Sequence, residues 1–217
     1  MACDICHTRK DKRFCPALHD RICPVCCGTE REVTLDCPSD CAYLQQARQN
    51  EKPRAIEDLD RDAPFLDVDI PERFLYEREP LILGLSFGVA KAARGDRSIN
   101  DRDAIGALTN MARSYHTLVE SGLVYESPTA SLPQQAIVAE LRSMIEEYRK
   151  IEQQNLGFTS LRDSDVLRAL VFMLRIALGR NNGRPKSRAY LDFLFSQFPE
   201  QKSAIAAPDE GSRIIVP

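Results

Sequence analysis

All eight cysteines of this 217-residue chain lie within its first 41 residues, at spacings that favour metal binding. Zinc takes four thiolate or imidazole ligands in a tetrahedron, and two cysteines separated by two residues can approach one ion from a single tight turn. Two pairs have this CxxC spacing, and the last pair has CxxxC spacing. The pattern therefore predicts zinc. The cysteines are Cys3, Cys6, Cys15, Cys23, Cys26, Cys27, Cys37 and Cys41.

Eight ligands complete two zinc sites, and the sequence offers two ways to reach eight. In the first, which we favour, one ion is bound by Cys3, Cys6, Cys23 and Cys26, and the other by Cys15, Cys27, Cys37 and Cys41. The neighbours Cys26 and Cys27 then reach different ions, which extended backbone allows because successive side chains face opposite ways. In the second, His19 replaces Cys27, which gives four ligand pairs in cross-brace order. Both predict two Zn²⁺ ions per chain.

Both ligand sets indicate structural zinc, because they fill all four positions around each ion. A catalytic zinc usually keeps one position for water or substrate. The sequence contains neither the deaminase pattern HxE…PCxxC nor the metalloprotease pattern HExxH. His116 follows Tyr115 in a helical pattern, and we interpret it as a packing or surface residue. We find no set of catalytic residues and expect that the protein is not an enzyme.

The last cysteine pair is expected to begin a helix. Cys37 followed by Pro38 has the pattern of an N-cap with proline at the first helical position. Cys41 then lies one turn later on the same face, and the helix is predicted to continue to Arg48. Thiolates at a helix N-terminus are favoured by the helix dipole. Zinc modules of the treble-clef and cross-brace type place ligands at the start of such a closing helix.

The stretch resembles the cross-brace zinc fingers of the MYND and HIT type, in which a CxxC pair opens the module and a cysteine-rich helix closes it. Those families end on a histidine near the last cysteine, whereas no histidine follows closely after Cys41. The stretch also resembles bacterial proteins with the pattern CPxxxxxICxxCCG…CPxxCxYL, matched here by Cys15–Gly28 and Cys37–Leu44. The resemblance covers only the cysteine-rich part and implies a zinc module without implying an activity.

Beyond the cysteines the sequence predicts helices. We expect a two-zinc module at residues 1–49, an acidic linker at 50–70, a helical domain at 71–198 and a flexible C-terminal tail at 199–217. Apolar residues recur at helical spacing through the third segment, without the alternation typical of strands. The predicted fold class is a small zinc-stabilised N-terminal module followed by an all-α helical bundle domain.

Capping residues divide the helical domain into its predicted helices. Pro71 and Pro80 are expected to open the first ones. Asn100 and Gly122 have the residue types of an N-cap and a C-cap. Further helices are expected from Pro133 to Gly157, from a Ser164 cap through Leu178, and from Pro185 to Phe198. The 164–178 helix is the more apolar of these, so we expect it at the centre of the bundle.

Charge is unevenly distributed. The formal net charge of −3 becomes about −7 when two zinc ions each bind four thiolates, which argues against general binding to phosphate backbones. Cations nevertheless concentrate in residues 180–188, here called the basic turn, and in the loop Arg9–Arg13. We expect both to offset the zinc-bound thiolates and to meet the acidic region 57–79. The cations of the basic turn are Arg180, Arg184, Lys186 and Arg188.

The favoured function is a non-enzymatic, zinc-binding interaction or adaptor protein whose helical domain binds a protein partner. The alternative is a regulatory factor that binds DNA or RNA through the basic turn and the Arg9–Arg13 loop. No secretory signal is visible, and no apolar run reaches the ~20 residues that span a bilayer. We therefore expect a cytoplasmic protein without membrane contact. In that reducing compartment clustered cysteines are metal ligands and not disulfides.

The metal count tests the two ligand sets. Native mass spectrometry should find two zinc ions per chain. Cys27→Ser should lose one ion because its site keeps only three ligands, whereas His19→Ala should retain both. The reverse pattern would select the set that contains His19, and a single zinc ion in the wild-type chain would contradict both sets.

Overall fold

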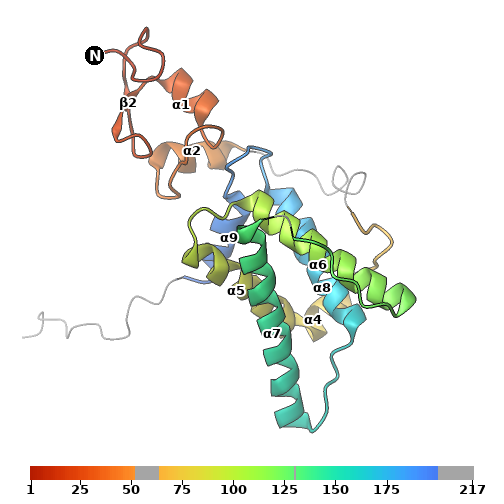
Figure 1. Cartoon of the computed structure of the whole chain (residues 1–217). Coiled ribbons are helices and arrows are strands. Elements are labelled where there is room, and N and C mark those ends of the chain that lie inside the picture. Colours follow the sequence, from red (N-terminus) through yellow and green to blue (C-terminus); the bar gives the residue numbers. More distant parts are fainter. Residues whose placement is uncertain (52–63, 130, 200–217) are drawn as a thin grey trace, which may run out of the picture.

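The computed structural model of the protein describes residues 1–51, 64–129 and 131–199. Within these ranges the chain forms eight helices and one two-stranded sheet, arranged as a small N-terminal module and a larger helical domain (Figure 1). This confirms the predicted fold class. The module contains β1 Arg13–Cys15, β2 Asp20–Ile22, α1 Pro24–Glu30 and α2 Ala42–Asn50. The helical domain contains α4 Glu72–Glu77, α5 Glu79–Gly95, α6 Asp101–Ser121, α7 Leu132–Leu156, α8 Asp163–Arg180 and α9 Ala189–Gln197.

The module begins with a hairpin that sequence patterning does not reveal. Strands β1 and β2 pair antiparallel, with Arg13 opposite Ile22 and Cys15 opposite Asp20. Each strand has three residues, which is too short for an alternation of apolar and polar residues to be recognised. Ile22 is fully buried and packs among the cysteines. The hairpin therefore places Cys15 and the start of α1 on the two sides of one small core.

The helix starts in the module differ from those expected. Cys23 caps α1, and Pro24 occupies its first turn, so the Cys-Pro pattern begins a helix here. Around Cys37 the chain instead makes a turn closed by the Cys41 amide, which donates to the Pro38 carbonyl at 3.0 Å, and α2 begins only at Ala42. The Cys-Pro pattern is the same at Cys23 and at Cys37. Only at Cys23 is it followed directly by a helix.

Cys26 and Cys27 lie in helix α1 and not in extended backbone. Successive side chains in an α-helix point about 100° apart, because one turn takes about 3.6 residues. The two sulfur atoms therefore still diverge. The expectation that the neighbours face different sites survives, while the backbone conformation that was expected to cause it is wrong.

The helical domain is built around α8, as its apolar sequence predicts. Nine residues of this helix are buried, and it packs against α5, α6 and α9. Helix α7 packs along α5 and also contacts α6 (Figure 1). Asn100 caps α6 and Gly122 ends it in the left-handed conformation, while Gly157 ends α7 in the same way. These bounds follow the predicted capping residues.

Two helix starts in this domain differ from the predicted ones. Helix α8 is capped by Arg162 and not by Ser164, since the Asp165 carboxylate accepts from the Arg162 amide at 3.4 Å. Helix α9 starts at Ala189 and not at Pro185. The buried carboxylate of Asp101, at the start of α6, accepts from the Tyr190 and Leu191 amides at 3.2 Å and so caps α9 from another helix.

Part of the predicted 50–70 linker belongs to the helical domain. Val68 is buried in the helical core, and Arg175 of α8 donates to the carbonyls of Phe65 and Val68 at 3.1 and 3.0 Å. Residues 64–70 are therefore fixed against α8. Residues 52–63 of the linker, and all but Pro199 of the predicted tail, lie outside the described residues.

The loop from α7 to α8 is closed by one carboxylate. Glu152 accepts from the amides of Ser160 and Leu161 at 2.8 and 3.0 Å, from the Thr159 hydroxyl at 2.9 Å, and from Arg78 at 3.2 Å. Burial raises the pKa of this carboxyl, but the hydrogen bonds from Ser160, Thr159 and Leu161 outweigh it and lower the pKa to about 2. The folded state therefore strongly favours the ionised form.

Replacing Glu152 should cost stability in a pH-dependent way. At pH 7 we expect Glu152→Gln to lower the free energy of unfolding by about 1–3 kcal/mol, because hydrogen bonds to a charged acceptor are lost. A lowered folded-state pKa contributes stability above the unfolded-state pKa of about 4.5, and this is lost as pH falls toward 2. The difference from wild type in urea unfolding should shrink over that window. The exposed neighbour Glu147→Gln is the matched control, and an equal loss for both variants would contradict this role.

Candidate metal centre

One group of four cysteines lies at metal-binding distance. The Sγ atoms of Cys3, Cys6, Cys23 and Cys26 lie within 4.8 Å of one another. Three of the four residues are buried and Cys6 is partly exposed. Tetrahedral zinc at Zn–S distances of about 2.3 Å needs sulfur atoms roughly 3.8 Å apart. The four thiols can therefore hold a metal ion with only small adjustments, as the CxxC spacing predicts.

Backbone amides and a helix N-terminus prepare this group for negative charge. The Cys23 amide donates to Cys3 Sγ at 3.1 Å, and the Cys26 amide donates to Cys23 Sγ at 3.4 Å. The latter bond lowers the pKa of Cys23, and hydrogen bonds from the hydroxyl and amide of Thr8 lower the pKa of Cys6 to about 5. Burial raises the pKa of Cys26 to about 12. A bound metal ion therefore has to displace the Cys26 proton, which makes binding weaker at low pH.

The other four cysteines surround a second, looser centre. They line one small cavity of about 10 Å³ together with apolar side chains such as Ile22, Leu35 and Leu44. In the described residues no three of these sulfur atoms lie within 4.8 Å of one another. A metal ion here would require the sulfur atoms to draw closer. The four cysteines are Cys15, Cys27, Cys37 and Cys41.

His19 lies apart from this cavity. Its side chain is exposed, its backbone is in the left-handed conformation with φ of 54°, and it is not among the residues that line the cavity around Cys27. Cys27, in contrast, is buried, and its Sγ accepts hydrogen bonds from Arg13 Nη1 at 3.4 Å and from Arg31 Nη2 at 3.9 Å. The geometry therefore brings Cys27 to the second group and does not bring His19.

The Arg9–Arg13 loop faces the cysteines, as expected. A hydrogen bond to Cys23 raises the pKa of Arg9, and Arg13 reaches Cys27 while its guanidinium lies 4.5 Å from the Tyr43 ring centroid. Asp11 pairs with the N-terminal ammonium at 3.0 Å. The arginines at both ends of the loop are thus placed to offset thiolate charge.

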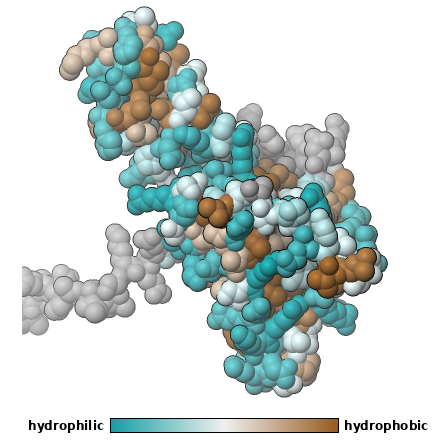
Figure 2. All heavy atoms as spheres, viewed as in Figure 1, coloured by the Kyte–Doolittle hydropathy of each residue, from teal (hydrophilic) through white to brown (hydrophobic). Residues whose placement is uncertain are grey.

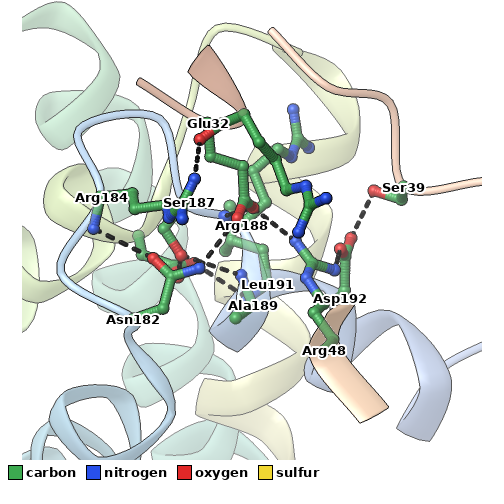
Figure 3. A network of polar contacts seen from close by, with 12 residues as sticks. Glu32, Ser39, Arg48, Asn182, Arg184, Ser187, Arg188, Ala189, Leu191 and Asp192 are labelled. Atoms are coloured by element: carbon green, nitrogen blue, oxygen red, sulfur yellow. Dashed lines mark hydrogen bonds and ion pairs between the residues drawn. The ribbon is translucent and has the colours of Figure 1, made fainter. Parts of the chain in front are cut away.

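The module contacts the helical domain through one buried carboxylate (Figure 3). Glu32 is only 1% exposed. Its carboxylate accepts from Arg48 Nη2 at 2.7 Å, from Asn182 Nδ2 at 2.8 Å and from the Arg188 amide at 3.4 Å. Its backbone carbonyl accepts from the Lys186 amide at 2.8 Å. The acceptor oxygens of Glu32 at the interface therefore all have hydrogen-bond donors. Some of these donors, such as Asn182, lie about 150 positions away in the sequence.

The contacts around Glu32 come from one short segment of the module, residues 28–34, here called the docking loop. Arg184 Nη1 donates to the Gly28 carbonyl at 3.2 Å and also to the carbonyl of Arg31. Lys186 Nζ donates to the Thr34 carbonyl at 2.7 Å. The docking loop lies between Cys27 and Cys37 in the sequence. It therefore connects two cysteines that line the same cavity.

A second set of contacts supports the interface from α2. Arg48 pairs with Asp192 of α9 as well as with Glu32, and Ser39 Oγ also donates to Asp192. Both carboxylates thus share the guanidinium of Arg48, whose side chain is only 18% exposed. Figure 1 shows α2 beside the segment that leads into α9, in line with these contacts.

The basic turn is used inside the molecule. Arg184 and Lys186 donate to the docking loop, Arg188 Nη1 donates to the Arg97 carbonyl at 2.6 Å, and the Arg180 guanidinium lies 3.6 Å from the Phe193 ring centroid. The turn was expected to offset the zinc-bound thiolates and to meet the acidic region 57–79. In the described residues it meets the carbonyls and the buried carboxylate of the module instead, and the described part of that region is contacted from α8.

Sequence reasoning missed Glu32, Asn182 and Asp192, because their residue types are those of ordinary surface positions. It also treated His116 as an isolated packing or surface residue, although Glu120 lies one helical turn later. In the structure His116 lies between Asp67 and Glu120. The i,i+4 spacing of a histidine and a carboxylate on one helix was the available signal.

Comparisons of the chain with protein-family models, with curated proteins and with solved structures found no match. Among the described residues no helix is both long enough and apolar enough to cross a membrane. The function has to be argued from the cysteine groups and the contacts of the module.

Removing the Glu32 carboxylate should weaken the interface without removing the metal ligands. We expect Glu32→Ala to lower the free energy of unfolding in urea by about 3–5 kcal/mol, because Arg48 and Asn182 lose a buried partner. Metal content per chain should stay at the wild-type value. Asp36→Ala, an exposed acidic position in the same part of the module, is the control and should change stability by less than about 0.5 kcal/mol. A small effect of Glu32→Ala would show that the interface contributes little.

Proposed function

We propose that the chain is a non-enzymatic, zinc-binding interaction protein of the cytoplasm, in which two structural zinc ions shape a module for binding another protein. The observation that supports this most strongly is the group Cys3, Cys6, Cys23 and Cys26, whose ligand atoms lie at metal-binding distance. Four thiolates complete the coordination of zinc and leave no position for substrate, which is typical of structural sites. The second zinc ion is proposed at Cys15, Cys27, Cys37 and Cys41, which surround one cavity.

The module has too small an apolar core to fold without such ions. Its buried cluster consists mainly of the cysteines themselves, with Ile22 and Leu35. Domains below about 40–50 residues usually require disulfides or metal ions, and metal binding then supplies folding free energy. The helical domain has its own core of buried residues from α4 to α9. Zinc thus controls the module and the docking loop, and it is not required for the bundle.

The sequence led us to expect a partner on the helical domain, but we propose a partner surface on the module. Phe14 is 53% exposed, Val25 is 50% exposed and Leu18 is 39% exposed. Figure 2 shows apolar residues gathered on the visible face of the module, while the neighbouring helical surface is more polar. Lys10 and Lys12 are exposed beside this hairpin. A partner that inserts an apolar side chain and presents carboxylates around it has the matching chemistry.

Exposed Lys10 and Lys12 favour the nucleic-acid alternative, but other cations that it needs contact the protein itself. Binding to phosphates requires Lys and Arg side chains that are free to contact them. Arg184 and Lys186 instead donate to the docking loop, and Arg9 and Arg13 face the cysteines. Protein binding is therefore the function that we propose.

Site-specific crosslinking tests this partner surface. A photoreactive amino acid at position 14 should crosslink one defined protein, and the yield should fall when zinc is chelated and when Lys10 and Lys12 are both changed to Glu. The same amino acid at Leu83 of α5, which is 47% exposed, is the control and should give no such product. Equal yields at both positions, or a yield that ignores the charge reversal, would contradict the proposed surface.

A further inference from the structure

A histidine in the helical domain lies between two carboxylates. His116 Nε2 is 2.7 Å from Asp67 Oδ2, and His116 Nδ1 is 3.3 Å from Glu120 Oε2. One ligand atom from each of the three residues lies within 4.8 Å of the others. The His116 side chain is 22% exposed and both carboxylates are 63% exposed. The cluster is therefore reachable from solvent while its ring is held in place.

Two elements bring these side chains together. His116 and Glu120 are one turn apart on α6 and so share a face of that helix. Asp67 comes from residues 64–70, which Arg175 and the buried Val68 fix against α8. Phe65 in this segment packs its ring 5.5 Å from that of His116. The position of Asp67 opposite the imidazole is thus set by contacts outside the cluster.

Two carboxylates at one imidazole favour the binding of a cation. A neutral imidazole carries one N–H and can donate to one acceptor only. With a carboxylate at each ring nitrogen, one of the two nitrogen–carboxylate contacts therefore has no hydrogen to share. A positive charge between those two atoms removes the conflict. That charge is either an added proton or a metal ion on one ring nitrogen. Imidazole and carboxylate together suit zinc and similar divalent transition metals.

We propose that Asp67 and His116 bind an exchangeable divalent transition-metal ion, with Glu120 as the positioning residue. The ion is bound by Nε2 and by the Asp67 carboxylate, which lie 2.7 Å apart and need to separate to about 3.3 Å to share one tetrahedral ion. Glu120 accepts the Nδ1–H and fixes the orientation and tautomer of the ring, as carboxylates commonly do for metal-binding histidines. Water fills the other positions, so the ion exchanges and can accept a further ligand.

This site differs in kind from the cysteine groups. It has nitrogen and oxygen donors, is partly exposed, and lies in the helical domain, which has a core independent of the cysteines. Its existence does not depend on the proposed partner binding by the module. The two kinds of site can also be told apart spectroscopically, because only cobalt bound by thiolates gives an intense sulfur-to-metal absorption.

Cobalt titration of the zinc-loaded full-length chain tests the site. We expect saturable Co²⁺ binding in calorimetry, with weak visible bands and no thiolate absorption, and with selective broadening of amide signals from residues 64–69 and 113–120. His116→Ala and Asp67→Asn should each abolish this binding at unchanged zinc content. Glu120→Ala should weaken it about 10–100-fold, whereas Glu120→Gln keeps an acceptor for Nδ1–H and should weaken it less.

The controls separate this site from general effects. His7→Ala removes a histidine from the module and should leave cobalt binding in the helical domain unchanged. Circular dichroism confirms that each variant is folded, and Asp67→Asn remains informative if His116→Ala is not. Absence of saturable cobalt binding in the zinc-loaded wild type, or binding that persists in both variants, would overturn the proposal.

Discussion

The buried carboxylate of Glu32 is the contact on which the arrangement of the two parts depends. A carboxylate removed from water is costly unless it is paired and hydrogen-bonded. Here Arg48 of the module and Asn182 of the helical domain both donate to it. Glu32 also adopts φ of 52°, a conformation that non-glycine residues seldom adopt. The surrounding structure has to enforce this conformation, and the cysteines on either side of the docking loop are placed to do so.

We propose that this arrangement links metal binding by the cysteines to the basic turn. The docking loop lies between Cys27 and Cys37, it presents Glu32 and several carbonyls, and Arg184 and Lys186 donate to those carbonyls. Cations that look available for nucleic acid in the sequence are thereby used to attach the module. Negative charge from thiolates is met separately by Arg13 and Arg31 at Cys27. The net charge of the chain therefore says little about its surface, since opposite charges are paired within it.

Short sequence patterns predicted those features that depend on interactions between residues close in the sequence. The cysteine spacing predicted the first metal group, and Asn100, Gly122 and Gly157 predicted helix ends, because caps depend on neighbouring residues. The start of α9 could not be predicted in this way, since Asp101 caps it from a distant helix. Glu32 could not be recognised either, because a buried glutamate and a surface glutamate have the same letter. Only the three-dimensional structure shows which of them has partners.

The most direct test is amide hydrogen exchange of the full-length chain with and without zinc. If metal ions fix the docking loop, and the loop attaches the module, chelation should increase exchange in residues 28–34 and also in residues 182–188, which contain no cysteine. Exchange in the buried middle of α7 should stay unchanged, because the helical core does not depend on zinc. Unchanged exchange in residues 182–188 after complete zinc removal would contradict the coupling between the metal centre and the interface.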